Sequence, residues 1–158
     1  MMKMRYLIML AFVFCLFIPQ VQADTRPRVS KGQTVYVPAY SHIYIGNRET
    51  PYLLAVTLSI RNISPSTPIT LTEVSYHDTQ GKLVKIFSKD PVLLDPLAST
   101  RHIIHRDDKD GGAGACFIVK WEATEKTNPP VIETVMIGTQ SQQGISFTSR
   151  GEVILEKE

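Results

Sequence analysis

The chain has 158 residues, which is enough for one domain, and it carries 17 basic and 15 acidic side chains. The formal net charge of +2 gives no strong basic field, so nucleic acid and anionic lipid surfaces are excluded as expected partners. The two cysteines are too few for a disulfide-rich scaffold.

The first 23 residues have the three parts of a secretory signal. Lys3 and Arg5 make a positive start, residues 6–18 form an apolar run, and Val21-Gln22-Ala23 resembles a cleavage site. The thirteen apolar residues would rise about 20 Å as a helix, whereas a membrane anchor must cross roughly 30 Å of hydrocarbon. We therefore expect a cleaved signal peptide over residues 1–23, an exported protein in the periplasm or outside the cell, and no stable membrane span after cleavage.

Cleavage after Ala23 would remove two basic residues and no acidic one, so the mature chain would have a formal net charge of zero. It would keep one cysteine, Cys116, and could form no internal disulfide. The polar stretch of residues 24–33, which contains a proline and a glycine, is typical of a flexible leader. One domain is expected after it, over residues 34–156.

From residue 35 onward, short apolar runs alternate with Pro, Gly, Asn and Asp, and period-two alternation replaces helical periodicity. The clearest case is residues 54–61, in which every second side chain is Leu, Val or Ile. In residues 69–76 the alternation changes phase at Thr72-Glu73, which predicts a β-bulge. Asp78 to Gly81 forms a predicted turn in which glycine can supply a positive φ, and residues 83–87 form the returning strand.

The second half of the chain continues in the same way. An edge strand is predicted at 92–94, a strand at 97–105 and a loop at 107–114. A central strand follows, with Phe117, Val119 and Trp121 on one face, and it breaks at 128–130. The last predicted elements are a strand in which Val131, Glu133, Val135 and Ile137 alternate, and two short strands at 144–149 and 151–155 about a turn at Ser149-Arg150-Gly151. About nine strands at this spacing predict an all-β, two-sheet antiparallel sandwich, immunoglobulin-like in the broad sense, with Trp121 between the sheets. A small β-barrel is the alternative.

Five segments in a fixed order are similar to a known family. They are VYVPAYSHIYIG (35–46), LAVTLSIRN (54–62), YHDTQGKLV (76–84), DGGAGACFIVKW (110–121) and VMIGTQSQQGISFTSRGEVI (135–154). The resemblance is to the exported bacterial proteins known as domain of unknown function 3124, and it covers residues 35–154. It implies an envelope or secreted protein, and it brings no activity, cofactor or partner with it.

Aromatic residues at the start of the domain form a candidate binding face. If residues 35–45 are extended, Tyr36, Tyr40, His42 and Tyr44 fall on one side and apolar residues on the other. Tyrosine combines an apolar ring with a polar tip, which suits a recognition surface for a peptide, a protein or a glycan. The alternative is that the tyrosines pack under loops, and a bend at Pro38 would separate them.

A second candidate site combines histidines and carboxylates. His102 and His105 precede a loop that contains Asp107 to Asp110, and these residue types can bind a metal or transfer a proton. The two histidines differ in parity, so a regular strand would point them to opposite faces. Asp108 and Asp110 match two positions of a calcium-binding loop, but Arg106 falls at the first ligand position. These two aspartates are therefore weak metal candidates, and no cofactor is expected.

The two remaining motifs have structural explanations. The glycines of residues 111–114 lead into a strand rather than a helix, so they indicate a tight turn and not a phosphate-binding loop. Cys116 lies in an apolar strand without a catalytic motif around it, which favours a buried, inert thiol.

No group of residues assembles a nucleophile, a base and an orienting partner. We therefore expect an exported, non-enzymatic binding or interaction module. One alternative is a small hydrolase or metal-assisted enzyme that uses His102, His105 and the Asp107–Asp110 loop. Another is a structural or protective envelope protein without a discrete site.

Overall fold

A computed structural model describes residues 29–140 and 143–157 of the chain. The predicted signal peptide, residues 1–23, lies outside the described residues, as does the first half of the predicted leader, residues 24–28. Residues 30–33 of that leader belong instead to the first strand, so the folded domain includes them. Across the described ranges, no helix is long and apolar enough to cross a bilayer.

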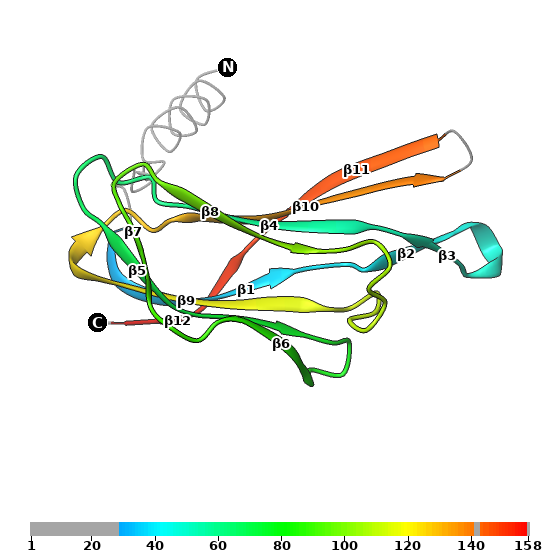
Figure 1. The fold of residues 1–158 in the computed structure, drawn as a ribbon, viewed down its shortest axis with the longest axis horizontal. Helices are drawn as coiled ribbons and strands as arrows, with labels where there is room; N and C mark the ends of the chain where they lie inside the picture. Colours follow the sequence, from blue (N-terminus) through cyan, green and yellow to red (C-terminus); the bar gives the residue numbers. More distant parts are fainter. Residues whose placement is uncertain (1–28, 141–142, 158) are drawn as a thin grey trace, which may run out of the picture.

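The described strands all pair antiparallel and form two facing sheets with one projecting hairpin (Figure 1). The large sheet has the order β12-β1-β9-β5-β6, and β7 also pairs with β5; its strands are β1 (Ser30–Pro38), β5 (Ile69–His77), β6 (Leu83–Ser88), β7 (Val92–Leu94), β9 (Cys116–Thr127) and β12 (Glu152–Glu156). The small sheet has the order β11-β10-β4-β8, with β4 (Ala55–Arg61), β8 (Ser99–Ile104), β10 (Val131–Gln140) and β11 (Gln143–Arg150). The hairpin joins β2 (His42–Ile45) to β3 (Thr50–Leu53) through the 3-10 turn η1 (Gly46–Arg48). The sheets do not close on each other, which confirms the predicted sandwich over the barrel.

The core lies between the two sheets, where the predicted alternation places it. The small sheet contributes Val56, Leu58 and Ile60 of β4, which are fully buried. The large sheet contributes the face of β9 that was predicted to be buried, on which Trp121 is only 2% exposed. β9 is central as predicted, because β1 and β5 flank it.

Two local predictions on β5 are confirmed. The pairing with β9 places Leu71 opposite Trp121 and Glu73 opposite Lys120, so Thr72 is the extra residue of a bulge. The predicted turn that follows has Gly81 at a φ of 79°, a conformation that side chains with a Cβ rarely adopt.

The predicted strand at 97–105 begins later than expected. Leu97 has a φ of 62°, which is left-handed and not extended, so β8 starts at Ser99. On β10 the buried side chains are Ile132, Thr134 and Met136. The predicted alternating set that contains Ile137 therefore points away from the core.

The predicted turn at Ser149-Arg150-Gly151 does not join a hairpin. β11 pairs with β10 in the small sheet, whereas β12 pairs with β1 in the large sheet, so the chain crosses between the sheets here. Gly151 makes this crossing possible, because a Cβ at this position would lie 2.6 Å from Cγ1 of Val35. Its backbone N–H donates to the Ile132 carbonyl at 2.9 Å.

A buried asparagine organises the end of the sandwich opposite the β2–β3 hairpin. The side-chain amide of Asn62 donates to the carbonyls of Thr67, Leu94 and Asp95 at 2.9–3.1 Å. Its Oδ1 accepts the backbone N–H of Ser64 at 3.0 Å. One side chain thus holds the loop after β4 against the segment after β7.

Candidate functional site

The side of the large sheet that faces away from the core carries a mixed set of side chains, and we call it the outer face. Opposite residues of an antiparallel pair share a face. The register places Thr34 of β1 beside Lys120 of β9, and Lys120 beside Glu73 of β5. The next row contains Tyr36, Ile118 and Ser75. The outer face is therefore charged across one half and more apolar across the other.

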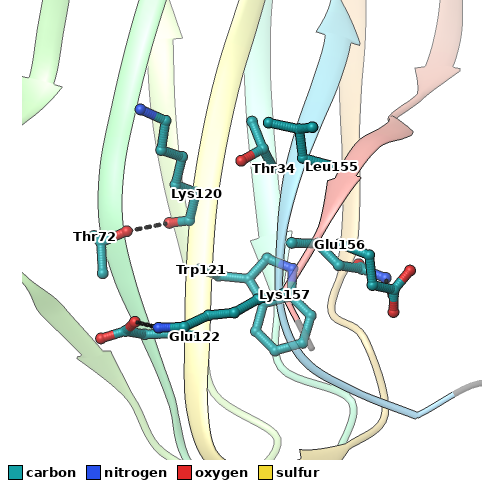
Figure 2. Close-up of a pocket in the computed structure, with 9 residues that line it drawn as sticks. Thr34, Thr72, Lys120, Trp121, Glu122, Leu155, Glu156 and Lys157 are labelled. Atoms are coloured by element: carbon teal, nitrogen blue, oxygen red, sulfur yellow. Dashed lines mark hydrogen bonds and ion pairs between the residues drawn. The ribbon is translucent and has the colours of Figure 1, made fainter.

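A shallow groove of about 310 Å³ crosses the charged half (Figure 2). The residues that line it come from β1, β5, β9 and the C-terminal strand: Gln33, Thr34, Thr72, Lys120, Trp121, Glu122, Leu155, Glu156 and Lys157. Trp121 is otherwise a core residue, and its indole N–H has no hydrogen-bond partner among the described residues. The groove combines hydroxyl groups, charged groups and one exposed aliphatic side chain.

Both lysines of the groove are bound to a carboxylate. Lys157 Nζ lies 2.6 Å from Glu122 Oε2, and Lys120 Nζ lies 2.7 Å from Glu73 Oε2. The first of these pairs is drawn in Figure 2. The hydrogen bond from Lys120 holds the pKa of the Glu73 carboxyl below its usual range. The groove therefore has polar donors and acceptors without a strong net field.

A serine and a histidine come together beside the groove. Ser75 Oγ lies 3.1 Å from His77 Nε2 and 3.0 Å from Glu73 Oε1, and His77 Nδ1 lies 3.2 Å from the Gly81 carbonyl. A nucleophile, a base and an orienting group are thus within hydrogen-bond distance. Ser75 is only 1% exposed, however, so its hydroxyl is closed to a substrate and the contact is structural.

Cys116 is buried on the outer face and not in the core. It lies opposite Pro38 on one side and His77 on the other, and its side chain is hydrogen-bonded to Tyr36. Burial raises the pKa of the Cys116 thiol, and the bond to Tyr36 offsets part of that effect. The predicted buried, inert thiol agrees with this environment.

Comparison with known proteins places the chain in a family. Residues 32–154 match the family described as protein of unknown function DUF3124. The chain belongs to this family. A search of curated proteins finds no match to the DUF3124 chain.

A solved structure with some likeness is the crystal structure of Thermotoga maritima 1070. It shares 13% sequence identity with the DUF3124 chain and aligns over 76% of this chain and 92% of its own, with a TM-score of 0.44.

The aromatic residues predicted as a binding face of the DUF3124 domain do not lie on one strand. The chain bends after Pro38, where β1 ends, and β2 begins at His42. Tyr36 lies on the outer face, whereas Tyr40 packs against Phe147 at a ring distance of 6.1 Å. His42 and Tyr44 stack edge-on at 5.2 Å on the hairpin, and Tyr44 is exposed. The predicted stripe is therefore divided among three places.

The predicted histidine and carboxylate site is also divided. His102 packs on Phe87 at a ring distance of 5.0 Å, and burial, helped by nearby Lys85, lowers its pKa. His105 lies outside β8 and is exposed. Asp108 accepts the backbone N–H of Asp110 at 3.2 Å. Within residues 29–140 and 143–157, no three His, Cys, Asp or Glu side chains are placed to hold a metal ion.

The glycine loop at 111–114 is hydrogen-bonded to two other segments of the chain, in agreement with its predicted structural role. The Gly111 carbonyl accepts the backbone N–H and the hydroxyl of Thr79 at 2.9 and 3.0 Å. The Gly112 carbonyl accepts the backbone N–H and the hydroxyl of Ser41 at 3.1 and 3.0 Å. These bonds fix the turn after β5 and the bend before β2.

Sequence reasoning missed the groove. The alternation of β9 carries a signal, since Lys120 and Glu122 follow Ile118 at period two on the face opposite Trp121. The partners of these residues come from β5 and from the residue just after β12, which are far away in the sequence. Only the strand order brings them together.

Proposed function

We propose that this protein is an exported, non-enzymatic binding module, and that its ligand is a neutral, hydroxyl-rich chain such as a glycan strand lying in the groove. The observation that carries the proposal is the charge balance of the groove. Each of its lysines is bound to a glutamate, at 2.6 and 2.7 Å. A charged polymer would have to compete with these ion pairs, whereas a neutral ligand can hydrogen-bond to them as they stand.

The other groups in the groove suit the same ligand. The Thr34 hydroxyl can both donate and accept, as sugar hydroxyls do, and the Thr72 hydroxyl, which donates to the Lys120 carbonyl at 3.3 Å, can accept. Leu155 offers apolar contact at one end, and Tyr36 presents an exposed ring one row away on the same face. A few placed polar groups beside apolar surface are typical of ligand sites.

Export and the absence of catalysis have separate support. The first 23 residues have the composition of a secretory signal. In the Ser75–His77 contact, which has the distances of a catalytic pair, the serine is buried and so is closed to a substrate.

Binding of neutral oligosaccharides to the purified protein tests the proposal. An array of neutral and charged oligosaccharides identifies a ligand, and calorimetry then compares the wild type with Thr34→Val and Lys157→Met. We expect both groove variants to weaken binding. The matched control is Thr57→Val on β4, which removes a hydroxyl from the far side of the small sheet and should leave binding unchanged. Selective binding of charged sugars, or equal loss in Thr57→Val, would refute the assignment.

A further inference from the structure

A row of residues crosses the outer face at one end of the groove. The backbone N–H of Lys157 donates to the Gly32 carbonyl at 2.8 Å, and Gly32 lies opposite Glu122. Thr70 of β5 lies on the other side of Glu122, and Leu93 of β7 follows Thr70. Because Gly32 has no side chain, the Lys157 side chain can pass over β1 and reach Glu122, as Figure 2 shows.

A second hollow, of about 270 Å³, adjoins the groove at this row. Both are lined by Glu122 and Lys157, and the other residues that line the second hollow are Pro68, Thr70, Leu93, Ala123 and Thr124. Thr70 and Leu93 belong to the row described above, so the second hollow opens on the outer face, as the groove does. The ion pair between Glu122 and Lys157 thus lies where the two hollows meet.

The groove and the second hollow carry the same kinds of groups. In the groove, the Thr34 hydroxyl has no hydrogen-bond partner among the described residues, and Leu155 is 66% exposed. In the second hollow, the hydroxyls of Thr70 and Thr124 likewise have no partner within the described part of the chain, and Leu93 is 62% exposed. A site with one set of groups repeated side by side matches a ligand made of repeated units.

The charges around the two hollows disfavour an acidic chain. In the second hollow, the charged lining residues within the described chain are Glu122 and Lys157, which neutralise each other. In the groove both lysines are bound to glutamates, whereas Glu156 accepts a hydrogen bond from the neutral Gln33 amide at 3.5 Å. Arg150 borders the inner side of Glu156, but the two form no ion pair in residues 29–140 and 143–157. The unneutralised carboxylate of Glu156 would repel an anionic polymer.

We propose that the groove and the second hollow are two subsites for consecutive parts of one neutral, β-1,4-linked glycan, which passes over the Glu122–Lys157 ion pair. This inference rests on the proposed function, because it takes the ligand to be a glycan. A β-1,4-linked chain is extended and can follow a row across a sheet, whereas an α-1,4-linked chain coils. The Lys157 and Glu122 side chains are 62% and 44% exposed, so a sugar hydroxyl above them can accept from the ammonium group and donate to the carboxylate.

The length of the glycan should therefore control its affinity. A short oligosaccharide occupies one subsite, whereas a longer one gains the contacts of the second without a second loss of translational freedom. The probes are β-1,4-linked oligomers of glucose and of N-acetylglucosamine, from two to six units long, with a hexamer of galacturonic acid as the acidic control. Calorimetry with the purified protein should show a gain of more than about tenfold from dimer to hexamer in at least one neutral series. The acidic hexamer should bind at least about tenfold more weakly than the best neutral hexamer.

The tenfold threshold excludes a simpler explanation. A hexamer can place any of its five adjacent pairs of units in one hollow, so a single hollow would raise the apparent affinity about fivefold at most.

One threonine from each hollow then locates the two subsites. Thr34→Val and Thr124→Val should each weaken hexamer binding several-fold and reduce the gain from dimer to hexamer. Leu93→Ser should act in the same direction as Thr124→Val, since both change only the second hollow. The matched control is Thr57→Val on the far side of the small sheet, which should change neither the affinity nor its dependence on length.

Three results would overturn the inference. The first is a gain with length of fivefold or less in both neutral series. The second is hexamer binding that Thr34→Val weakens but that Thr124→Val and Leu93→Ser leave unchanged, and this result would keep the proposed function with the groove alone. The third is no binding in either neutral series, in which case the array of oligosaccharides decides the proposed function separately.

Discussion

The hydroxyl group of Tyr76 occupies the space that a Cβ atom at Gly111 would need. A Cβ there would overlap the Tyr76 hydroxyl and lie 2.5 Å from Cζ of the ring and 2.8 Å from Cβ of Ala115. The hydroxyl is buried without a hydrogen-bond partner among the described residues. Burial, together with nearby Asp108 and Asp110, raises its pKa to about 12. The loop at 107–114 therefore lies directly over a neutral phenol.

Gly111→Ala should destabilise the protein, because the methyl group forces the loop and the ring apart. We expect a loss of about 1–3 kcal/mol in the free energy of unfolding, measured by urea denaturation. Tyr76→Phe should recover part of this loss in the double variant. The control is Gly144→Ala, where a Cβ would meet nothing within 4 Å and the change should be about 0.5 kcal/mol or less. Equal losses in both variants would contradict the overlap.

Asn62→Ala should be among the most damaging single changes. It removes the donors to three carbonyls and the acceptor of one N–H, all at the same end of the sandwich. Each buried group left without a partner costs about 1–3 kcal/mol. Urea denaturation should show a loss of several kcal/mol. Asn47→Ala, at an exposed position in the turn after β2, is the matched control and should change little.

The thiol of Cys116 should react slowly with a disulfide reagent in the native protein and quickly in urea. Burial keeps the pKa of the thiol raised, and the thiolate is the reactive form. Tyr36→Phe removes the hydroxyl that lowers this pKa, so native labelling at a fixed pH should become slower still. Tyr44→Phe, on the hairpin, should label like the wild type. Rapid native labelling of the wild type would point to an accessible redox thiol.

His102 should make stability depend on pH. Its pKa in the folded protein lies below the ordinary value of 6.5, because burial disfavours the charged form. The unfolded chain therefore binds the proton more readily, so stability falls as the pH drops below 6.5 and levels off below the folded pKa. His102→Phe keeps a ring against Phe87 and should remove this slope from urea denaturation series between pH 5 and 7. A slope that persists in His102→Phe would assign the effect to another group.

The divided tyrosines should differ in their contribution to stability. Tyr40 packs against the core and Phe147, so Tyr40→Ala should cost several kcal/mol. Tyr44 is 56% exposed, and Tyr44→Ala should change the unfolding free energy by about 0.5 kcal/mol or less. Thermal melts of the two variants check this. Similar losses in both would show that the hairpin is held as firmly as the sandwich.

Local pattern was sufficient to predict most of the strands. The alternation in residues 54–61 predicted β4, and the phase change at Thr72 predicted the bulge, because each depends on which side chains a short segment buries. The bend after Pro38 was expected only as an alternative, and the left-handed Leu97 was missed. Both depend on contacts with other segments: the Ser41 N–H donates to the Gly112 carbonyl, and the Leu97 N–H donates to the Ser64 carbonyl.

The candidate site could not be predicted in the same way. Lys120 and Glu122 follow from the sequence as outward residues of one strand, but their bound partners, Glu73 and Lys157, lie on β5 and just after β12. Strand order is a property of the whole chain. The final turn also looked like a hairpin, because nothing local distinguishes a hairpin glycine from Gly151, which crosses between the sheets.

The pairing of the first strand with the last has a consequence for the folding rate. β1 has both of its neighbours, β9 and β12, in the last third of the described chain. Because the chain is synthesised from its N-terminus, the large sheet cannot be completed until β12 has been synthesised. Closing such long loops is slow, on the order of milliseconds to seconds in all-β domains. If the protein is exported as proposed, its precursor would thus stay unfolded well after its first strand has been synthesised, which is the state that a threading export channel accepts.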